Sequence, residues 1–400
     1  MLMAAAAAAS ATAACRETGE TGSAAPRVPD VLVAKTTNGL AVVRDGRLTT
    51  AGAGVLSLTG STLCLASRTA GHTEVEFVTT LNGTRLGRHA LPGTWTPRVT
   101  SGDGGLVALA GPVADPAKPG ARDKTTIVVA DSKHQVTSLT LPGVLEPDAF
   151  AADGQALYVL EWLPATAPDH YRVRRLEFST RTLQPLFTRD KVPVPAGAEE
   201  EMRGEGRMAV ASPTGRVLYT LYTHQPEHQH TRNLISGRPG NVHAFVHTLE
   251  TSQGWAYCVD LPEPFGHSPS SAHTLALSDN GNMLVVADLA QGLLARISTE
   301  TLKVLNVVQL GFHKEGTAFA AATDHRIYLG AGTSVQVLDL DGKSVEQWQN
   351  PTPVRGLAVS RDLARVYIAR DGAVTWRDTT SGTAGGEAAL AGLTGLIRTA

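Results

Sequence analysis

The feature that most constrains the fold is a short motif that recurs along the chain. An apolar strand ends in Ser or Ala, a turn of Gly, Asp or Asn follows, and a second strand is rich in β-branched and aromatic residues. Three copies lie at residues 208–219, 275–287 and 357–369. Hairpins repeated every few tens of residues, with no helical pattern between them, are typical of β-propeller blades. We therefore predict an all-β chain that forms a single β-propeller of four-stranded antiparallel blades, because stacked repeats build one closed body.

Turn signals and alternating polarity divide the chain into eight blades, with seven as the alternative count. The second to eighth blades are expected at residues 55–91, 97–142, 147–189, 206–262, 271–310, 317–349 and 354–390. Residues 395–399 resemble the first strand of a blade that lacks its later strands. Residues 31–34, 40–43 and 47–50 resemble later strands that lack a first one. We predict that the N- and C-terminal strands pair, which closes the ring and removes exposed sheet edges.

Charge and cysteine content exclude several classes of protein. The net charge is −2, charged residues are 18% of the chain and there is no Lys/Arg block, so a nucleic-acid partner is not expected. Three cysteines, at positions 15, 64 and 258, cannot form a disulfide framework, and their separations match no zinc motif. No stretch after the N-terminal region approaches the ~18 apolar residues of a membrane span.

Residues 1–29 have the character of a leader and a flexible tether, and residues 30–400 form the propeller domain. An Ala-rich run ends in Thr12-Ala-Ala-Cys15 and is followed by a stretch of Gly, Ser, Pro and charged residues. This order predicts a bacterial lipoprotein signal with lipidation of Cys15, although no Lys or Arg precedes the run and Thr12 stands where Leu is usual. The alternatives are a cleaved, secreted form and a cytosolic protein with an Ala-rich tail.

A resemblance to a known family rests on residues 283–311, in which an L-Y-V-type strand is followed by a V-x-V-x-D-x-x-T-type strand. Asp339 in Val335-Gln-Val-Leu-Asp-Leu-Asp and the Leu218-Tyr-Thr220 segment carry similar patterns. The chain resembles the YVTN/YncE-type, WD40-like propeller repeats of secreted bacterial proteins, and its leader is similar to those of actinobacterial lipoproteins. The resemblance implies a propeller and an extracytoplasmic setting, and it carries no catalytic residues.

Four long connections are expected on one face and in one sector of the ring. Strands of a blade alternate in direction, so the second-to-third-strand loops share a face with the connections between blades. Pro112–Asp123, Leu163–Asp169 and His224–Gly240 are loops of the first kind, and Lys191–Glu205 joins the fourth blade to the fifth. Long loops held on a rigid scaffold often bind ligands. Tolerated surface insertions are the alternative interpretation.

The His224–Gly240 loop is the leading candidate site because it holds three imidazoles and a carboxylate within seven residues, which suits a divalent metal ion. Candidate metal ligands are His224, His228, His230 and His243, the last expected to share a strand face with His247. Candidate ligand-binding residues are His224, Glu227, His228, His230, Glu161 and Arg203. As residues of a surface loop, these histidines are expected to have ordinary pKa values, near ~6.5. Structural histidines in a polar surface loop are the competing interpretation.

The sequence therefore predicts a monomeric, extracytoplasmic propeller, anchored to the membrane by a lipid or secreted. We expect a noncatalytic module that binds a protein or small-molecule ligand through the loop-rich face, with no cofactor beyond a possible divalent metal. The alternative is a propeller enzyme, such as a metal-dependent lactonase or hydrolase. Such an enzyme draws metal ligands from several blades around the axis, whereas the His and Glu candidates here are concentrated in one blade.

Overall fold

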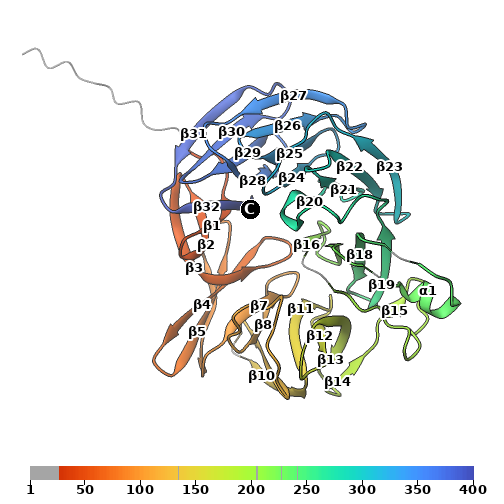
Figure 1. Cartoon of the computed structure of the whole chain (residues 1–400). Coiled ribbons are helices and arrows are strands. Elements are labelled where there is room, and N and C mark those ends of the chain that lie inside the picture. Colours follow the sequence, from red (N-terminus) through yellow and green to blue (C-terminus); the bar gives the residue numbers. More distant parts are fainter. Residues whose placement is uncertain (1–26, 134, 204–205, 227, 241) are drawn as a thin grey trace, which may run out of the picture.

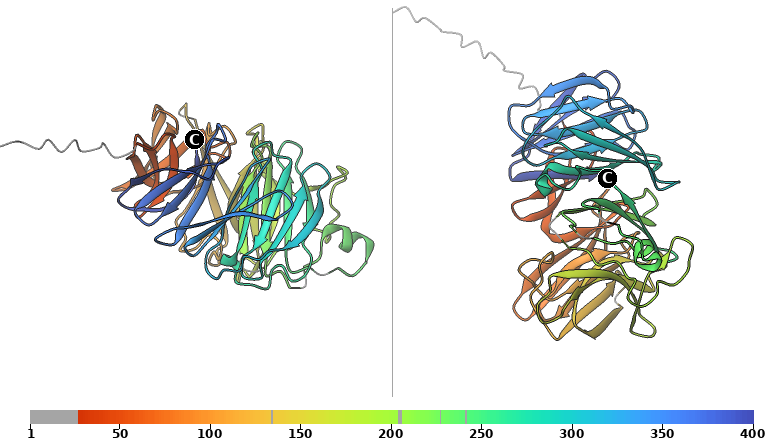
Figure 2. Two further views of the ribbon diagram at one scale, coloured as in Figure 1. Left: turned by 90° about the horizontal axis from the view of Figure 1, so that it is seen from above. Right: turned by 45° about the vertical axis from the view of Figure 1, so that its right-hand side comes forward.

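The computed structural model describes residues 27–133, 135–203, 206–226, 228–240 and 242–400, and these form a ring of β-sheets arranged radially around a centre (Figure 1). Cys15 and Glu227 lie outside the described residues. Two further views show the strands of neighbouring sheets stacked side by side around the ring (Figure 2). All strand pairs are antiparallel except one, among the described residues. The all-β architecture of mostly four-stranded antiparallel sheets confirms the fold class predicted from the repeats.

The first and last strands of the chain share a seven-stranded sheet, ordered β32-β1-β2-β3-β4-β5-β6. Its strands are β1 (Leu32–Thr36), β2 (Gly39–Arg44), β3 (Arg47–Leu56), β4 (Thr62–Thr69), β5 (His72–Thr79), β6 (Arg85–Pro92) and β32 (Leu393–Thr399). Strand β3 serves both halves of this sheet, because its first part pairs with β2 and its last four residues pair with β4.

Six further sheets complete the ring, each running from an inner strand to an outer one. The sheet that follows along the chain contains β7 (Thr96–Thr100), β8 (Leu106–Ala110), β9 (Lys124–Asp131) and β10 (Val136–Pro142). The next contains β11 (Val144–Phe150), β12 (Ala156–Leu163), β13 (His170–Glu177) and β14 (Thr182–Gln184). The sheet after that carries the His224–Gly240 loop, which we call the histidine loop. This sheet, the histidine sheet, contains β15 (Phe187–Thr188), β16 (Gly206–Ala211), β17 (Val217–Thr223), β18 (Phe245–Glu250) and β19 (Trp255–Asp260).

The last three sheets have four strands each and follow one another along the chain. They contain β20 (His273–Leu277), β21 (Met283–Asp288), β22 (Leu293–Ser298), β23 (Lys303–Gln309), β24 (Phe319–Ala322), β25 (Ile327–Ala331), β26 (Ser334–Leu338), β27 (Ser344–Gln349), β28 (Val354–Val359), β29 (Arg365–Arg370), β30 (Ala373–Asp378) and β31 (Ala384–Ala389). A 3₁₀ turn, Ser270–Ala272, precedes β20.

The predicted pairing of the chain ends is confirmed. Strand β1 pairs antiparallel with β32 from Leu32 opposite Thr399 to Thr36 opposite Leu393. The amide of Ala400 also donates to the carbonyl of Val31, at 2.9 Å. The C-terminal strand is therefore the inner strand of the sheet that begins the chain, and it lies near the centre of the ring (Figure 1).

The recurrent sequence motif has a physical basis in the turn between the two inner strands. In five sheets a Ser at the end of the first strand accepts, through its hydroxyl, a backbone N–H five residues later. These serines are Ser57, Ser101, Ser212, Ser278 and Ser360. Each hydroxyl satisfies a donor that the turn leaves without a ladder partner, which is why Ser recurs at this position.

Apolar layers between neighbouring sheets hold the ring together. Strands such as β12, β21, β25 and β29 are apolar over almost their whole length, as expected of strands covered on both faces. Buried tyrosines fill the gaps between sheets, among them Tyr158, Tyr328 and Tyr367. In the described part of the chain, no helix is long and apolar enough to cross a membrane.

Two features differ from the sequence prediction. Residues 187–188, expected at the end of the fourth blade, form β15 and pair in parallel with β19 at the outer edge of the histidine sheet. This extra strand covers backbone groups that an outer edge would otherwise expose. Secondly, the histidine loop contains a short helix, α1 (Thr231–Ser236), which ends at Gly237 in a left-handed conformation. The helix projects from the outer side of the ring (Figures 1 and 2).

Candidate functional site

The four long connections lie next to one another, as their place in the topology predicted. The backbone amide of Arg122 donates to the carbonyl of Ala165, which joins the first loop to the second. Tyr171, just after the second loop, exchanges two backbone hydrogen bonds with Met202 of the Lys191–Glu205 connection. The amide of Arg203 donates to the Gln225 side chain at 2.7 Å, which joins that connection to the histidine loop.

A pocket of about 390 Å³ lies between the Lys191–Glu205 connection, α1 and the outer strands of the histidine sheet, and we call it the histidine-sheet pocket. Its walls are mainly apolar and are lined by Val173, Leu186, Val192, Val194, Met202, Ile235, Ala256 and Tyr257. Its polar lining includes Glu200, His247 and Cys258, and Arg189 and Arg232 each place a guanidinium about 5.5 Å from the centre of the Tyr257 ring. Val192 and Ile235 are more than half exposed, so apolar surface reaches the solvent here.

The polar side of this pocket is built from three separate segments of the chain. Strand pairing sets His247 of β18 directly opposite Cys258 of β19. The connection supplies Glu200, whose Oε2 accepts a hydrogen bond from the Cys258 thiol at 3.0 Å and whose Oε1 accepts the amide of Thr231 at 2.9 Å. The histidine loop supplies Thr231 and Arg232 to the lining, and the adjacent His230 places its Nδ1 3.5 Å from Oε2 of Glu200.

A second imidazole, His228, lies behind these groups. Its ring stacks on Phe245 with ring centres 4.3 Å apart, and its Nε2 lies 3.1 Å from Nδ1 of His230. Both imidazoles are almost fully buried, with side chains 1% and 3% exposed, whereas the sequence suggested a surface loop. Burial follows because the loop folds back over β18 and its histidines pack against Phe245.

In each buried imidazole, the ring nitrogen that points away from the other imidazole, which we call the outer nitrogen, donates a hydrogen bond to an oxygen. Nδ1 of His228 donates to the Glu201 carbonyl at 3.0 Å, and Nε2 of His230 donates to Oδ1 of Asp260 at 2.6 Å. The guanidinium of Arg232 holds the same Asp260 carboxylate through both oxygens, at 2.7 and 2.6 Å. The inner nitrogens, Nε2 of His228 and Nδ1 of His230, therefore face each other and the Glu200 carboxylate, and their hydrogen bond at 3.1 Å requires one proton between them.

The pKa values in the cluster are far from ordinary, in contrast to the sequence expectation. Burial lowers the pKa of His228 to about 4, against the opposing charge of Glu200. Burial also disfavours the charged form of His230, but hydrogen bonds to Asp260 and Glu200 outweigh it and raise its pKa. Burial and the neighbouring Glu200 carboxylate raise the pKa of the Cys258 thiol well above its usual range. Burial and hydrogen bonding therefore shift the pKa values of the two buried imidazoles in opposite directions.

The structure separates the histidines that the sequence grouped. His224 hydrogen-bonds to Thr223 at 2.9 Å, and its ring centre lies 6.3 Å from that of His273. His243 precedes β18, so it does not share a strand face with His247, and its ring packs against His267 with centres 4.1 Å apart, near Glu263. Of the predicted ligands, only His228 and His230 belong to the cluster at the pocket.

The described residues predicted to bind a ligand all lie outside the lining of this pocket, and His228 and His230 reach it only through their contacts with Glu200. Glu161 pairs with Arg172 at 2.7 Å and with Arg174 at 3.6 Å, and the same two arginines contact Glu199. The side chain of Arg203 is exposed. Both residues therefore belong to the loop-rich sector, Glu161 in an ion-pair network beside the connection and Arg203 at the surface.

Sequence reasoning did not select Glu200, Cys258, Asp260 and Arg232. Glu200 stood in an acidic run that suggested a solvated loop, and Cys258 matched no zinc spacing because its neighbours in space come from other segments. A usable signal was present in the β18–β19 hairpin, where a turn at residues 251–254 sets His247 opposite Cys258. Local spacing rules do not detect such pairs.

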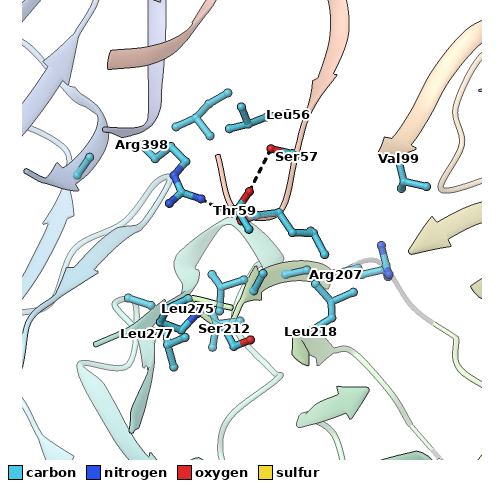
Figure 3. A pocket seen from close by; sticks show the side chains of 18 of the residues that line it. Leu56, Ser57, Thr59, Val99, Arg207, Ser212, Leu218, Leu275, Leu277 and Arg398 are labelled. Carbon is cyan, nitrogen blue, oxygen red and sulfur yellow. Dashed lines mark hydrogen bonds between the residues drawn. The ribbon is translucent and has the colours of Figure 1, made fainter. Parts of the chain in front are cut away.

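A larger cavity, of about 1120 Å³, occupies the centre of the ring (Figure 3). Inner strands line it with apolar side chains such as Val99, Leu218 and Leu275. Several of its charged groups are engaged: Arg207 pairs with Asp148 and reaches the Tyr222 hydroxyl, and Arg398 donates to the carbonyl of Leu58 at 3.0 Å. This cavity therefore presents both apolar and polar surface, and several of its charges are already engaged within the protein.

Comparison with known proteins supports the fold alone. No protein-family model matches the chain, and no curated protein matches it in sequence. Among solved structures, the dihydro-heme d1 dehydrogenase NirN, in complex with DHE, is 13% identical with a TM-score of 0.53 over 94% of this chain and 76% of that one. Apo AztD from Citrobacter koseri is 12% identical with a TM-score of 0.54 over 92% of this chain and 96% of that one. The chain therefore has a β-propeller fold.

Proposed function

We propose that this protein is a noncatalytic, extracytoplasmic binding module whose ligand enters the histidine-sheet pocket. The observation that carries the proposal is that two of the four long connections, Lys191–Glu205 and His224–Gly240, form walls of this pocket. Rigid sheets hold such loops in place, so ligand binding costs little conformational entropy.

The chemistry of the pocket favours an apolar ligand, or an apolar side chain of a partner protein, that carries a negative group. Apolar walls supply contact area, and the exposed Val192 and Ile235 extend that surface beyond the pocket. Arg189, whose guanidinium lies over the Tyr257 ring and donates to two backbone carbonyls, offers a cation to an anion, whereas Arg232 is already held by Asp260.

The first test uses 8-anilinonaphthalene-1-sulfonate, a fluorescent probe with apolar rings and one sulfonate. We expect saturable binding to the folded protein, at least tenfold weakened by Ala256→Trp, because the indole fills a pocket of about 390 Å³. The measurement is fluorescence titration at fixed protein concentration, with circular dichroism as the check that the variant is folded.

A matched control is Ala384→Trp, which adds the same indole to an exposed position on β31, the outer strand of another sheet. This variant should bind the probe as the wild type does. Equal binding by all three proteins would place the probe outside the histidine-sheet pocket and would count against the proposal.

A metal-dependent lactonase or hydrolase is the alternative function. A catalytic metal of that kind would draw ligands from several sheets around the axis. Two carboxylates that line the central cavity are already paired, Glu146 with Arg98 and Arg122, and Asp148 with Arg207, while Asp115 and Asp279 accept backbone amides. These pairings support the noncatalytic proposal.

The extracytoplasmic setting and the lipid anchor are proposals from residues 1–29, and the segment Thr12-Ala-Ala-Cys15 is the observation behind them. Acyl chains contribute about 0.8 kcal/mol per buried CH₂, and more than one chain is needed for stable anchoring. We expect Cys15→Ser to move the protein from the membrane fraction to the soluble fraction of its native host. Intact-mass measurement of the native protein decides the question, since a chain that retains Met1 or lacks acyl groups has no such anchor.

We also infer that the ring has eight blades and that its repeats are of the YVTN/YncE type. The count follows if the seven-stranded sheet is divided at β3, giving one blade of β32-β1-β2-β3 and another of β3-β4-β5-β6. The six remaining sheets then supply one blade each.

A further inference from the structure

We propose that Glu200, His230 and Cys258 bind one divalent transition-metal ion of the zinc type at the polar side of the histidine-sheet pocket. The inference adds a metal ion to the pocket of the proposed function and rests on that pocket for the entry of the ion. It does not require an organic ligand. The residues come from the Lys191–Glu205 connection, the histidine loop and β19.

The distances between ligand atoms fit a tetrahedral site. One oxygen of Glu200, one nitrogen of His230 and the sulfur of Cys258 all lie within 4.8 Å of one another. Oε2 of Glu200 is 3.0 Å from Sγ of Cys258 and 3.5 Å from Nδ1 of His230. Zinc–ligand bonds of about 2.0–2.3 Å at the tetrahedral angle require ligand atoms roughly 3.3–3.7 Å apart, so the two pairs that involve Glu200 already lie close to the required distance.

The surrounding hydrogen bonds orient the ligands as metal sites require. Asp260 accepts the Nε2–H of His230, which leaves Nδ1 as the coordinating nitrogen, and Arg232 holds Asp260 in turn. A carboxylate behind a coordinating imidazole is the usual second layer of a zinc site. His228 is fixed in the same way by the Glu201 carbonyl, so its Nε2 lone pair also faces this group at 3.1 Å from His230.

A metal ion also resolves the charge balance of the cluster. Two imidazole nitrogens, a carboxylate and a thiol converge in a region where His228, His230 and Cys258 are at most 4% exposed. Without a metal, the 3.1 Å hydrogen bond between Nε2 of His228 and Nδ1 of His230 requires one extra proton between the two imidazoles, and the thiol donates to Glu200. When a dication binds, the thiol proton and the extra imidazole proton leave to solvent, and a thiolate, a neutral imidazole and a carboxylate remain as ligands.

The second group of close potential ligands, His243, Glu263 and His267, serves as the internal comparison. Its side chains are partly buried to exposed, and the two imidazole rings lie 4.1 Å apart at an angle of 36° to each other. None of its three potential ligands contains sulfur, so a metal ion bound there can be distinguished by spectroscopy from one bound by Cys258.

The test measures zinc by equilibrium dialysis and mass spectrometry of the full chain carrying Cys15→Ser, so that the leader thiol does not contribute. We expect one tightly bound Zn²⁺ per chain, and at least 100-fold weaker binding after Cys258→Ala or Glu200→Gln. Cys64→Ala is the matched control, because Cys64 is equally buried but lies in the apolar core between other strands. This control and His267→Ala should both keep the tight site.

Cobalt provides the second measurement, since Co²⁺ bound by a thiolate shows a sulfur-to-metal charge-transfer band in the near ultraviolet. The band should appear with one equivalent of Co²⁺, disappear in Cys258→Ala and persist in Cys64→Ala. Absence of tight zinc binding, or tight binding without the thiolate band, would overturn the inference. If zinc fails to bind while Ala256→Trp still blocks the fluorescent probe, the metal site is refuted and the proposed pocket function stands. If zinc binds while Ala256→Trp leaves binding of the fluorescent probe unchanged, the metal site stands and the proposed pocket function is refuted.

Discussion

Removal of residues 395–400 is expected to unfold the protein or to cause aggregation at room temperature. The deletion removes most of β32, including its pairing with β1 and the largely buried Leu396. Loss of one buried Leu side chain alone costs about 2–5 kcal/mol, and a whole domain is stable by only about 5–15 kcal/mol. The exposed edge of β1 would also offer a template for pairing between chains. Thermal unfolding and light scattering measure both effects.

A point variant separates loss of the strand from loss of its contacts. Leu396→Ala should lower the free energy of unfolding by about 2–3 kcal/mol, because the side chain is 8% exposed and packs in the core beneath β28 to β31. Leu305→Ala is the matched control on an outer strand, where Leu305 is 56% exposed, and it should change the stability by less than about 0.5 kcal/mol. A truncated chain that melts with the wild type and stays monomeric would show that β32 does not close the ring.

The fold could be predicted from the sequence because local signals repeat. A Ser such as Ser360 ends one strand, and its hydroxyl accepts a hydrogen bond from the backbone amide of Arg365 at the start of the next strand. Each such Ser therefore marks a hairpin turn in the sequence. The lone strand at the C-terminus and the incomplete set at the N-terminus were complementary, and β1 and β32 do pair. Strand β15 was missed because its parallel pairing is short and depends on the distant β19, which no local pattern encodes.

The candidate site could be predicted only in part. Topology placed the four long connections in one sector, and His228 and His230 lie in the cluster there. Their burial was not visible in the sequence, because Gln, Glu and His around them are typical of an exposed loop. Glu200 and Cys258 lie 58 positions apart and meet only because the Lys191–Glu205 connection crosses the outer strands of the histidine sheet. Spacing rules describe ligands on one helix or one loop, whereas this cluster joins three segments.

The second large effect is expected at Glu146, the carboxylate that joins two neighbouring sheets beside the central cavity. Its side chain is 3% exposed and pairs with Arg122 at 2.6 Å and with Arg98 at 3.3 Å. Burial already lowers the pKa of the Arg98 guanidinium, so the cation depends on this carboxylate. Glu146→Ala leaves the cation buried without a counter-ion and should lower the free energy of unfolding by about 3–5 kcal/mol, measured by urea denaturation.

Removing both members of that pair should cost less than removing one. In the double variant Glu146→Leu with Arg98→Met, apolar side chains replace both buried charges, and Arg122, which is 23% exposed, can turn toward water. We expect at least half of the lost stability to return. The surface pair Arg355–Asp371 is the control, because both side chains are at least 40% exposed and Asp371→Ala should cost less than about 1 kcal/mol. A double variant less stable than Glu146→Ala would mean that Arg98 holds the neighbouring strand chiefly through its bond to the Gly111 carbonyl, and that the charge pair itself contributes little.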